Sequence, residues 1–253
     1  QTGRESLRTA QPEAAVLIPA EGRREEPVMT LHGVGWRAGG RSILEGVDLT
    51  LFRGERLLLL GDNGCGKTSL LRLMARLARP TAGEIRQFID PALGQRRGSR
   101  AWFRRGGVVY QNPNCQLFMP TVAQEVAFAA KSEDFAREIM ELFGIAHLSK
   151  RHPHSLSEGQ KRRVSIAAVA ASQPELLLLD EPTVGQDGEG LRTLLHALNH
   201  LHTRTGSTIV TVTHDCRCAG ALCDRVAWLR EGCIEKTGGP ELIEAVWGDS
   251  AAM

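Results

Sequence analysis

A glycine-rich stretch of eight residues has the composition and spacing of a loop that wraps around phosphate groups. Residues 61–68 read GDNGCGKT and match the pattern GxxxxGK[ST] at every fixed position. Glycine adopts backbone conformations that turn successive amide N–H groups toward an anion. Lys67 is suited to reach the terminal phosphates, and the Thr68 hydroxyl is suited to bind Mg²⁺. We therefore expect a phosphate chain to lie against Gly61, Asp62, Asn63, Gly64, Cys65, Gly66, Lys67, Thr68 and Ser69.

Two adjacent carboxylates follow a short apolar run later in the chain. Residues 176–179 are all leucine and are followed by Asp180 and Glu181, as at the carboxyl end of a buried strand, where open α/β sheets bind ligands. Asp180 is suited to hold Mg²⁺, and Glu181 to orient or deprotonate the attacking water of a phosphoryl transfer. By itself such a pair is often a solvated turn. Together with the phosphate loop, it predicts a site that hydrolyses ATP.

The elements predicted around these groups alternate between strands and helices. Residues 28–34 and 43–51 have strand-like patterns joined by a turn at 38–40, and residues 56–60 are typical of a buried strand. A helix is expected from 66 to 78, ending before Pro80. Further strands are predicted at 108–110, 176–179, 208–213, 225–229 and 233–236, and further helices at 188–202, 216–223 and 241–246. This alternation predicts a parallel sheet covered by helices.

The chain divides into two unequal parts. Residues 1–27 are rich in Ala, Glu, Arg and Pro without a sustained apolar period, so we expect a flexible tail or linker there and one domain over 28–253. Residues 121–171 are predicted to be mostly helical, and this stretch is too long for a simple crossover between strands. A helical subdomain over about 112–172 is therefore expected. The first residue is Gln rather than Met, which favours a segment upstream or one half of a tandem protein.

At this point the sequence resembles the nucleotide-binding subunit of ATP-binding cassette (ABC) transporters. Residues 156–160 read LSEGQ, similar to the family signature LSGGQ at the start of a predicted helix, with Glu158 in place of the first Gly. The resemblance implies that Ser157, Gly159 and Gln160 contact the γ-phosphate of ATP held by a second subunit. Free amides at a helix N-terminus suit such an anion. In isolation, a Ser at this position is more often only a helix cap.

The fold that the resemblance implies is α/β: an ABC-type P-loop ATPase with a mostly parallel core sheet, an N-terminal antiparallel β subdomain and an inserted helical subdomain. Gln111 matches the glutamine that ligates magnesium and senses the transporter in this family. His214 matches the histidine that contacts the γ-phosphate and the water. Residues 184–187 match the family's D-loop, a segment at the interface between subunits, and Gln186 stands where an apolar residue is usual.

The residue that stacks on adenine is less well defined by the pattern. The family carries an aromatic residue upstream of the phosphate loop, and this chain has Ala38 at that position, with Trp36 two residues earlier. Trp36 could take the stacking role after a shift in register. The alternative is that Trp36 packs against the first strands.

One segment points to a narrower group within the family. Residues 111–128 read QNPNCQLFMPTVAQEVAF and resemble the stretch QNPDDQLF…TV…DVAFG of energy-coupling factor (ECF) transporter ATPases, which serve importers of cobalt, nickel and vitamins. Leu117, Phe118, Val122 and Val126 could offer apolar surface to a helix of a membrane subunit. The alternative is that they form the core of the helical subdomain.

Composition restricts the remaining possibilities. Lys plus Arg total 31 and Asp plus Glu total 29, a net charge of +2, so there is no global electrostatic reason to bind nucleic acid. No apolar run approaches the roughly 18 residues of a membrane-spanning helix. The basic stretch 96–105 is interpreted as a solvated loop, with contact to nucleic acid or anionic lipid as alternatives. The spacing of the pair His196 and His200, and of Cys216, Cys218, Cys223 and Cys233, does not favour a structural zinc site.

The sequence therefore predicts the ATP-hydrolysing subunit of an ECF-type importer, peripheral at the cytoplasmic face of the membrane. Lys67, Glu181 and His214 are expected to be catalytic, and Thr68, Gln111 and Asp180 to hold Mg²⁺ beside ATP. Expected partners are a second ABC subunit, a transmembrane coupling subunit and a substrate-capture membrane protein, but no nucleic acid. The alternatives are a soluble ABC ATPase acting on nucleic acid or the ribosome, and a regulator that binds ATP without hydrolysing it.

Overall fold

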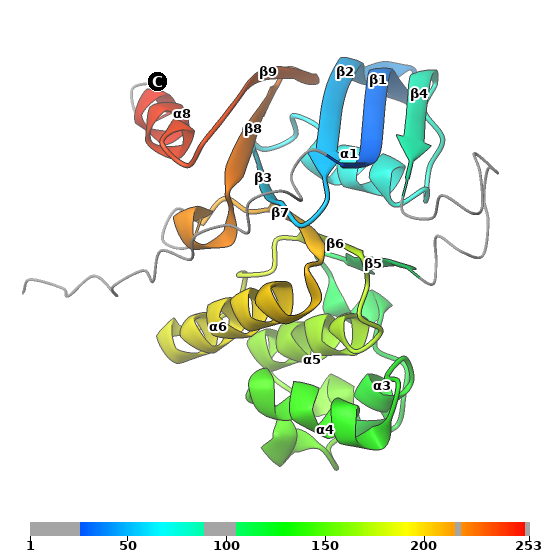
Figure 1. Cartoon of the computed structure of the whole chain (residues 1–253), viewed down its shortest axis with the longest axis vertical. Helices are drawn as coiled ribbons and strands as arrows, with labels where there is room; N and C mark the ends of the chain where they lie inside the picture. Colours follow the sequence, from blue (N-terminus) through cyan, green and yellow to red (C-terminus); the bar gives the residue numbers. More distant parts are fainter. Residues whose placement is uncertain (1–25, 89–104, 216–218, 251–253) are drawn as a thin grey trace, which may run out of the picture.

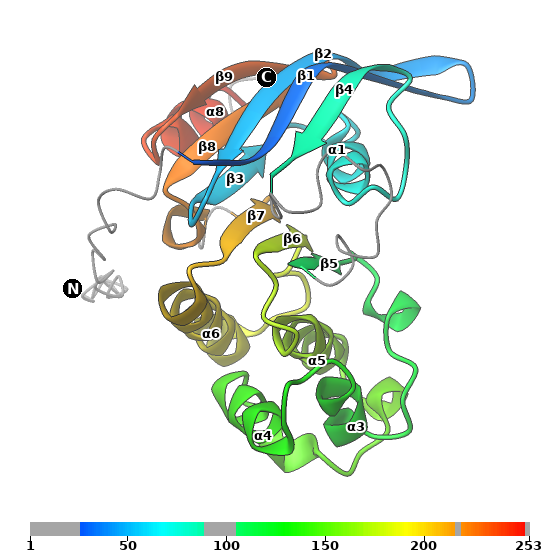
Figure 2. The same cartoon turned by 45° about the vertical axis from the view of Figure 1, so that its right-hand side comes forward.

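The computed structural model describes residues 26–88, 105–215 and 219–250. Most of the predicted tail, most of the basic stretch 96–105, and Cys216 and Cys218 lie outside the described residues. Two sheets lie one above the other, with the larger helices gathered at one end of the molecule (Figures 1 and 2). This arrangement confirms the predicted α/β class with separate antiparallel and mostly parallel sheets.

The smaller sheet is antiparallel and has the order β2-β1-β4, formed by β1 (Pro27–Ala38), β2 (Arg41–Phe52) and β4 (Ala82–Gln87). The first two strands confirm the predicted hairpin. The third was missed, because its sequence AGEIRQ is polar and its residues are mostly exposed. Its strand conformation comes from pairing with β1, a contact that local sequence does not reveal.

The larger sheet has the order β5-β6-β7-β3-β8-β9. The strands β5 to β8 in this order are parallel, and β9 pairs with β8 in the antiparallel sense. Their bounds are β3 (Arg56–Leu60), β5 (Gly106–Val109), β6 (Leu176–Asp180), β7 (Thr208–Val212), β8 (Arg225–Arg230) and β9 (Cys233–Gly238).

The helices follow the predicted order with some changes in length. They are α1 (Lys67–Met74), α3 (Val122–Ala127), α4 (Glu133–Leu142), α5 (Glu158–Ala170), α6 (Gly188–Thr205) and α8 (Leu242–Ser250). Helix α1 was expected to reach residue 78, but it ends at Met74, and the left-handed backbone of Arg76 (φ 57°) follows it. Short 3₁₀ helices lie at Pro113–Cys115, Ala146–Leu148, Pro153–Ser155 and Gly220–Leu222. Of the helix predicted at 216–223, the described part contains only the last of these turns.

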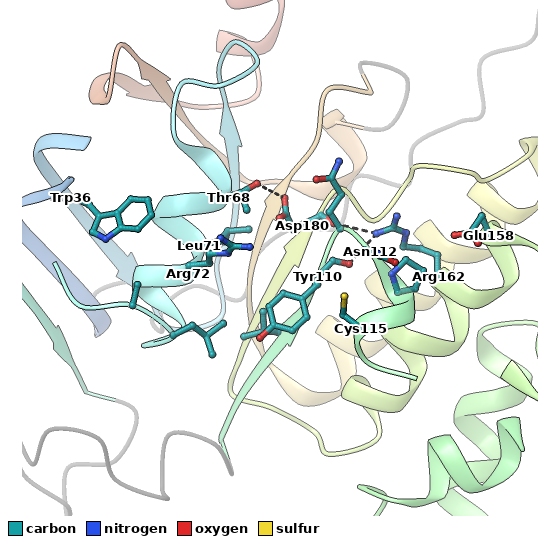
Figure 3. Close-up of a pocket in the computed structure, with 15 residues that line it drawn as sticks. Trp36, Thr68, Leu71, Arg72, Tyr110, Asn112, Cys115, Glu158, Arg162 and Asp180 are labelled. Carbon is teal, nitrogen blue, oxygen red and sulfur yellow. Dashed lines mark hydrogen bonds between the residues drawn. The ribbon is translucent and has the colours of Figure 1, made fainter. Parts of the chain in front are cut away.

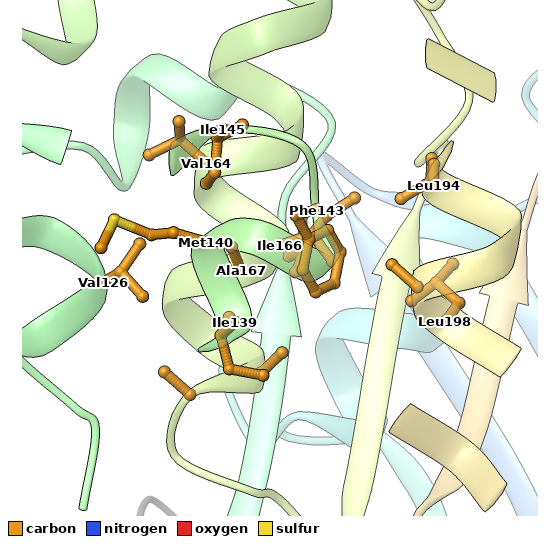
Figure 4. Close-up of a cluster of buried hydrophobic side chains, with 14 of the residues drawn as sticks. Val126, Ile139, Met140, Phe143, Ile145, Val164, Ile166, Ala167, Leu194 and Leu198 are labelled. Carbon is orange, nitrogen blue, oxygen red and sulfur yellow. The ribbon is translucent and has the colours of Figure 1, made fainter. Parts of the chain in front are cut away.

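Three apolar clusters pack against the larger sheet, and the two largest lie on opposite faces of β6. Because side chains alternate along a strand, Leu177 and Leu179 of β6 face the core beneath α3 to α6, and Leu176 and Leu178 face the core shared with α1 and the smaller sheet. Phe143 is fully buried in the first core, between α5 and α6 (Figure 4). Helices α3 to α5 fall within 112–172, and their core also includes α6 and the sheet. The assignment of 112–172 to a separate subdomain stays a prediction.

Within the described residues, no helix has both the length and the apolar character needed to cross a membrane. The same part of the chain holds no cluster of three or more His, Cys, Asp or Glu side chains able to bind a metal ion. The rings of His196 and His200 stack on each other along α6, with centroids 6.2 Å apart.

Candidate nucleotide-binding and hydrolysis site

The phosphate loop joins the end of β3 to the start of α1, the arrangement that the sequence predicted. Two of its glycines have no room for a side chain. A Cβ on Gly61 would lie 2.1 Å from the Leu229 carbonyl oxygen, and one on Gly66 (φ 109°) would lie 2.8 Å from the Leu44 side chain. The loop therefore passes close to β2 and β8, and its curvature leads directly into the positive end of the α1 dipole.

The Lys67 side chain lies inside this curve. Its ammonium group donates hydrogen bonds to the carbonyl oxygens of Gly61 and Asp62, both at 2.7 Å. These bonds fix the cation next to the loop amides, and the residue as a whole is buried. The arrangement concentrates positive potential where the sequence places the terminal phosphates of a nucleotide.

Thr68 and Asp180 meet across the first turn of α1 and the end of β6. The Thr68 hydroxyl lies 3.3 Å from Asp180 Oδ1 and donates to it. Burial raises the pKa of the Asp180 carboxyl, and the neighbouring Glu181 charge raises it further, while the Thr68 hydrogen bond and Arg162 oppose the shift. A hydroxyl and a carboxylate are hard oxygen ligands of the kind that Mg²⁺ prefers, so this pair fits the ion.

Glu181 and His214 form a second pair, brought together because β6 and β7 are neighbours in the sheet. Glu181 Oε1 lies 2.9 Å from His214 Nδ1, and the His214 amide donates to Oε2 at 3.3 Å. An ionised carboxylate only accepts, so Nδ1 carries the proton in this bond. The Glu181 side chain is 9% exposed and that of His214 is 64% exposed. A fixed carboxylate is thus paired with an imidazole whose other ring edge is available to ligand or water.

The backbone of Glu181 has an unusual conformation. Its φ is 51°, in the left-handed region that residues other than glycine rarely adopt. The Glu181 amide donates to the Val212 carbonyl oxygen at 2.9 Å, which holds the chain in this turn at the sheet edge. Strain of this kind, of order 1–3 kcal/mol, is commonly found where a side chain has to be aimed at a ligand.

A cavity of about 700 Å³ contains most of the predicted groups. It is lined by the phosphate loop, Gln111 and Glu181, and by Ala38, Arg41, Ser42 and Ile43 of the hairpin between β1 and β2. A second cavity of about 750 Å³, shown in Figure 3, shares Thr68 and Gln111 with the first as lining residues. Trp36 lines this second cavity, and Ala38 lines the first. Stacking of adenine on Trp36 stays a prediction.

The predicted signature segment is placed apart from the first cavity. Ser157 is the N-cap of α5: its hydroxyl accepts from the Gln160 amide at 3.3 Å, and its own amide donates to the Gln160 side chain at 3.1 Å. Neither these two residues nor Gly159 is among the residues that line the cavity of the phosphate loop. Glu158, the departure from the family pattern, forms an ion pair with Lys161 at 2.9 Å, so its charge is balanced locally.

Sequence reasoning missed a buried cation beneath the site. Arg162 on α5 is 4% exposed, and its guanidinium donates to the Tyr110 carbonyl oxygen at 3.1 Å and lies 3.5 Å from that of Asp180. Burial lowers its pKa, and the carboxylates of Asp180, Glu158 and Glu181 oppose this shift. The residue thus connects α5 to the chain just before Gln111 and to the carboxylate pair. The sequence signal that could have identified Arg162 was its position on the inward face of the helix predicted there.

Comparison with known proteins identifies the family of this chain. The profile of the ABC transporter family matches residues 44–184. The cobalt import ATP-binding protein CbiO of Rhodobacter capsulatus is 39% identical, and the alignment covers 85% of this chain and 78% of that protein. The energy-coupling factor transporter ATP-binding protein EcfA of Methanocaldococcus jannaschii is 35% identical, with coverage of 81% and 76%.

Solved structures agree with the sequence relatives. The structure of cbiO1 from Clostridium perfringens, described as part of the ABC transporter complex cbiONQ, superposes with a TM-score of 0.72 at 30% identity and covers 90% of this chain and 93% of that one. A dimeric structure of the ATP-binding cassette MJ0796 bound to ADP and Pi has a TM-score of 0.71 at 25% identity, with coverage of 83% and 98%. This chain therefore belongs to the ABC transporter family and carries its ATP-hydrolysing domain.

Proposed function

We propose that this chain is the ATP-hydrolysing subunit of an energy-coupling factor importer for metal ions or vitamins, peripheral at the cytoplasmic face of the membrane. Relatives named as EcfA and CbiO support the assignment. The observation that carries it is the course of the segment 111–128. This segment begins with Gln111 at the nucleotide cavity and contains Phe118 and Phe128, whose exposed rings contact each other.

The exposed surface for a membrane subunit differs from the one expected from the pattern. Leu117, Val122 and Val126 are at most 3% exposed and belong to the core beneath α3 to α6, because α3 turns its apolar face toward α4 and α5. Phe118 and Phe128 are instead 65% and 67% exposed. Their rings meet edge to face with centroids 5.6 Å apart. This aromatic pair is our proposed docking point for a helix of the transmembrane coupling subunit.

The chain between the nucleotide cavity and the aromatic pair is held by side chains rather than left as a free loop. The Gln116 amide group donates to the Val108 carbonyl oxygen at 2.6 Å and accepts from the Tyr110 amide at 2.8 Å. The buried Glu125 carboxylate accepts from the amides of Phe118 and Met119 at 2.9 and 2.8 Å. A movement at Gln111 would therefore be transmitted to Phe118 through a short, hydrogen-bonded connection.

Hydrolysis in this proposal uses groups that the fold already holds in place. The loop amides and Lys67 bind and orient the phosphates, and Thr68, Asp180 and Gln111 would hold Mg²⁺. When bound, the ion would neutralise charge on the phosphate oxygens. Glu181 orients the attacking water and accepts its proton at a carboxylate oxygen. His214 keeps that carboxylate in position through Nδ1 and presents its other edge to the γ-phosphate.

The remaining signature residues act on a second subunit. Ser157, Gly159 and Gln160 lie outside this chain's own cavity, which supports a role at the nucleotide of a paired ABC subunit, either a second copy or a related chain. A substrate-capture membrane protein completes the proposed importer. The proposal assigns residues 28–253 to the ATPase domain and the preceding residues to a tail or linker.

The test is co-purification of the tagged chain with an integral membrane subunit from detergent-solubilised membranes of its source. We expect the native chain and Glu181→Gln, which leaves the docking surface intact, to retain a membrane subunit. The double variant Phe118→Ser and Phe128→Ser should lose it while still binding ATP. Retention of the same membrane subunit by the double variant would refute the docking surface. Absence of any membrane subunit with the native chain would refute the importer assignment.

A further inference from the structure

The D-loop, residues 184–187, is in direct contact with the first turn of α5. Its backbone carbonyl at Gly185 comes so close to α5 that a Cβ on Gly159 would lie 2.4 Å from that oxygen. Gly185 itself adopts a φ of 76°, which favours glycine at the turn. The two segments are 26 residues apart in sequence, yet their backbones meet with no side chain between them.

Gln186 bonds to both sides of this contact. Its amide nitrogen donates to the Gly159 carbonyl oxygen at 2.9 Å, and its amide oxygen accepts from Arg163 Nη1 at 2.7 Å. Both groups of the primary amide are therefore used by one helix. Val184, Gly185 and Asp187 around it are exposed, while Gln186 is only partly so, since its side chain turns inward toward α5. A leucine of similar size could make neither bond.

The start of α6 leaves room for this arrangement. A Cβ on Gly190 would lie 2.3 Å from Arg163 Nη1 and 2.7 Å from Gln186 Oε1. Asp187 caps the same turn by accepting from the Gly190 amide at 2.7 Å. The glycine at 190 thus admits the guanidinium and amide groups next to the helix end. Three glycines and two polar side chains together form this contact between the D-loop and α5, which we call the Gln186 clamp (Gly159, Arg163, Gly185, Gln186 and Gly190).

We propose that Gln186 is a positioning residue that locks the D-loop to the Ser157 end of α5, so that both segments meet a second subunit as one rigid unit. The role in pairing rests on the proposed function, whereas the lock itself is a property of the single chain. Because only residues 181–183 separate β6 from the D-loop, the clamp also ties the Ser157 helix to the segment that carries Glu181. A change at the carboxylate pair would then move Ser157 rather than the D-loop alone.

The lock is tested by hydrogen exchange with mass spectrometry on the full chain, without nucleotide. Loss of the two bonds in Gln186→Leu should raise exchange about tenfold at 157–160 and at 184–187 together. Gly190→Ala should have the same effect, because its Cβ displaces the Arg163 guanidinium, and the two changes combined should be no worse than either one. Gln124→Leu, the same chemical change at an exposed position of α3, should alter neither segment. Unchanged exchange, or a rise in the D-loop alone, would overturn the lock.

The consequence for pairing is measured separately, by sedimentation of the Glu181→Gln protein with ATP and its paired subunit. Adding Gln186→Leu should weaken association about tenfold while the affinity of the single chain for a fluorescent ATP analogue stays within twofold. Equal association with and without Gln186→Leu would overturn the role of the clamp alone. Failure of Glu181→Gln to associate at all would overturn the proposed pairing, and the exchange experiment would still decide the lock.

Discussion

Replacing Glu181 with glutamine separates the two ways in which this side chain could act. The carboxylate accepts two hydrogen bonds from His214, one at Nδ1 and one at the backbone amide. A primary amide can accept only at its oxygen, so the variant loses one of these bonds. The net cost of that loss is about 0.5–1.5 kcal/mol, or about tenfold in rate at most.

Removal of a general base has a larger effect, typically 100- to 10,000-fold, or about 3–5 kcal/mol of transition-state stabilisation. We therefore expect Glu181→Gln to lower kcat by at least 100-fold and to leave ATP affinity within twofold. The assay is phosphate release at saturating ATP and Mg²⁺ with the assembled subunits, together with binding of a fluorescent ATP analogue. Glu133→Gln, the same change at an exposed position in the first turn of α4, should leave both quantities unchanged.

A loss of tenfold or less would refute this reasoning, because the missing hydrogen bond alone would then account for the change. The proton acceptor would have to be sought elsewhere. A loss of ATP affinity in the same variant would also contradict this reasoning. Among the described residues, neither the phosphate loop nor Lys67 forms a hydrogen bond with Glu181.

Three further predictions follow from burial and cavity shape. The pKa of Asp180 is raised in the folded state, so between the ordinary and the raised pKa the native protein holds more protons than the unfolded chain, and the free energy of unfolding falls as pH rises through that window. Asp180→Asn should therefore have a higher melting temperature than the native protein at pH 7 without Mg²⁺, and this difference should disappear toward pH 4. The same variant should show no Mg²⁺-dependent hydrolysis. Ala38→Tyr should tighten ATP binding by ~1–3 kcal/mol, because no aromatic residue in the described ranges lines the phosphate-loop cavity; unchanged affinity by calorimetry would favour a base position near Trp36 instead. Phe143→Ala should lower the free energy of unfolding in urea by ~3–5 kcal/mol, and a loss below 1 kcal/mol would contradict its place in the core.

Many of the site residues could be predicted from the sequence because they lie in short continuous segments. The phosphate loop is one continuous stretch between a strand and a helix, and its glycines are needed at fixed offsets from Lys67. The leucines before Asp180 likewise predict a buried strand with carboxylates at its end, and the hairpin of β1 and β2 is recognisable from its turn. In each case residues close in sequence are also close in space, so spacing alone carries the information.

Other features depend on which elements become neighbours. The bond between Glu181 and His214 exists because β6 and β7 lie side by side, although the two residues are 33 positions apart. β4 is a strand only because β1 offers an edge to pair with. Within 117–128, packing of α3 on α4 and α5 decided that Phe118 is exposed while Val122 is core, since an apolar residue has the same local propensity on either face. Contacts between distant segments set burial and partners, and therefore only the tertiary structure decided them.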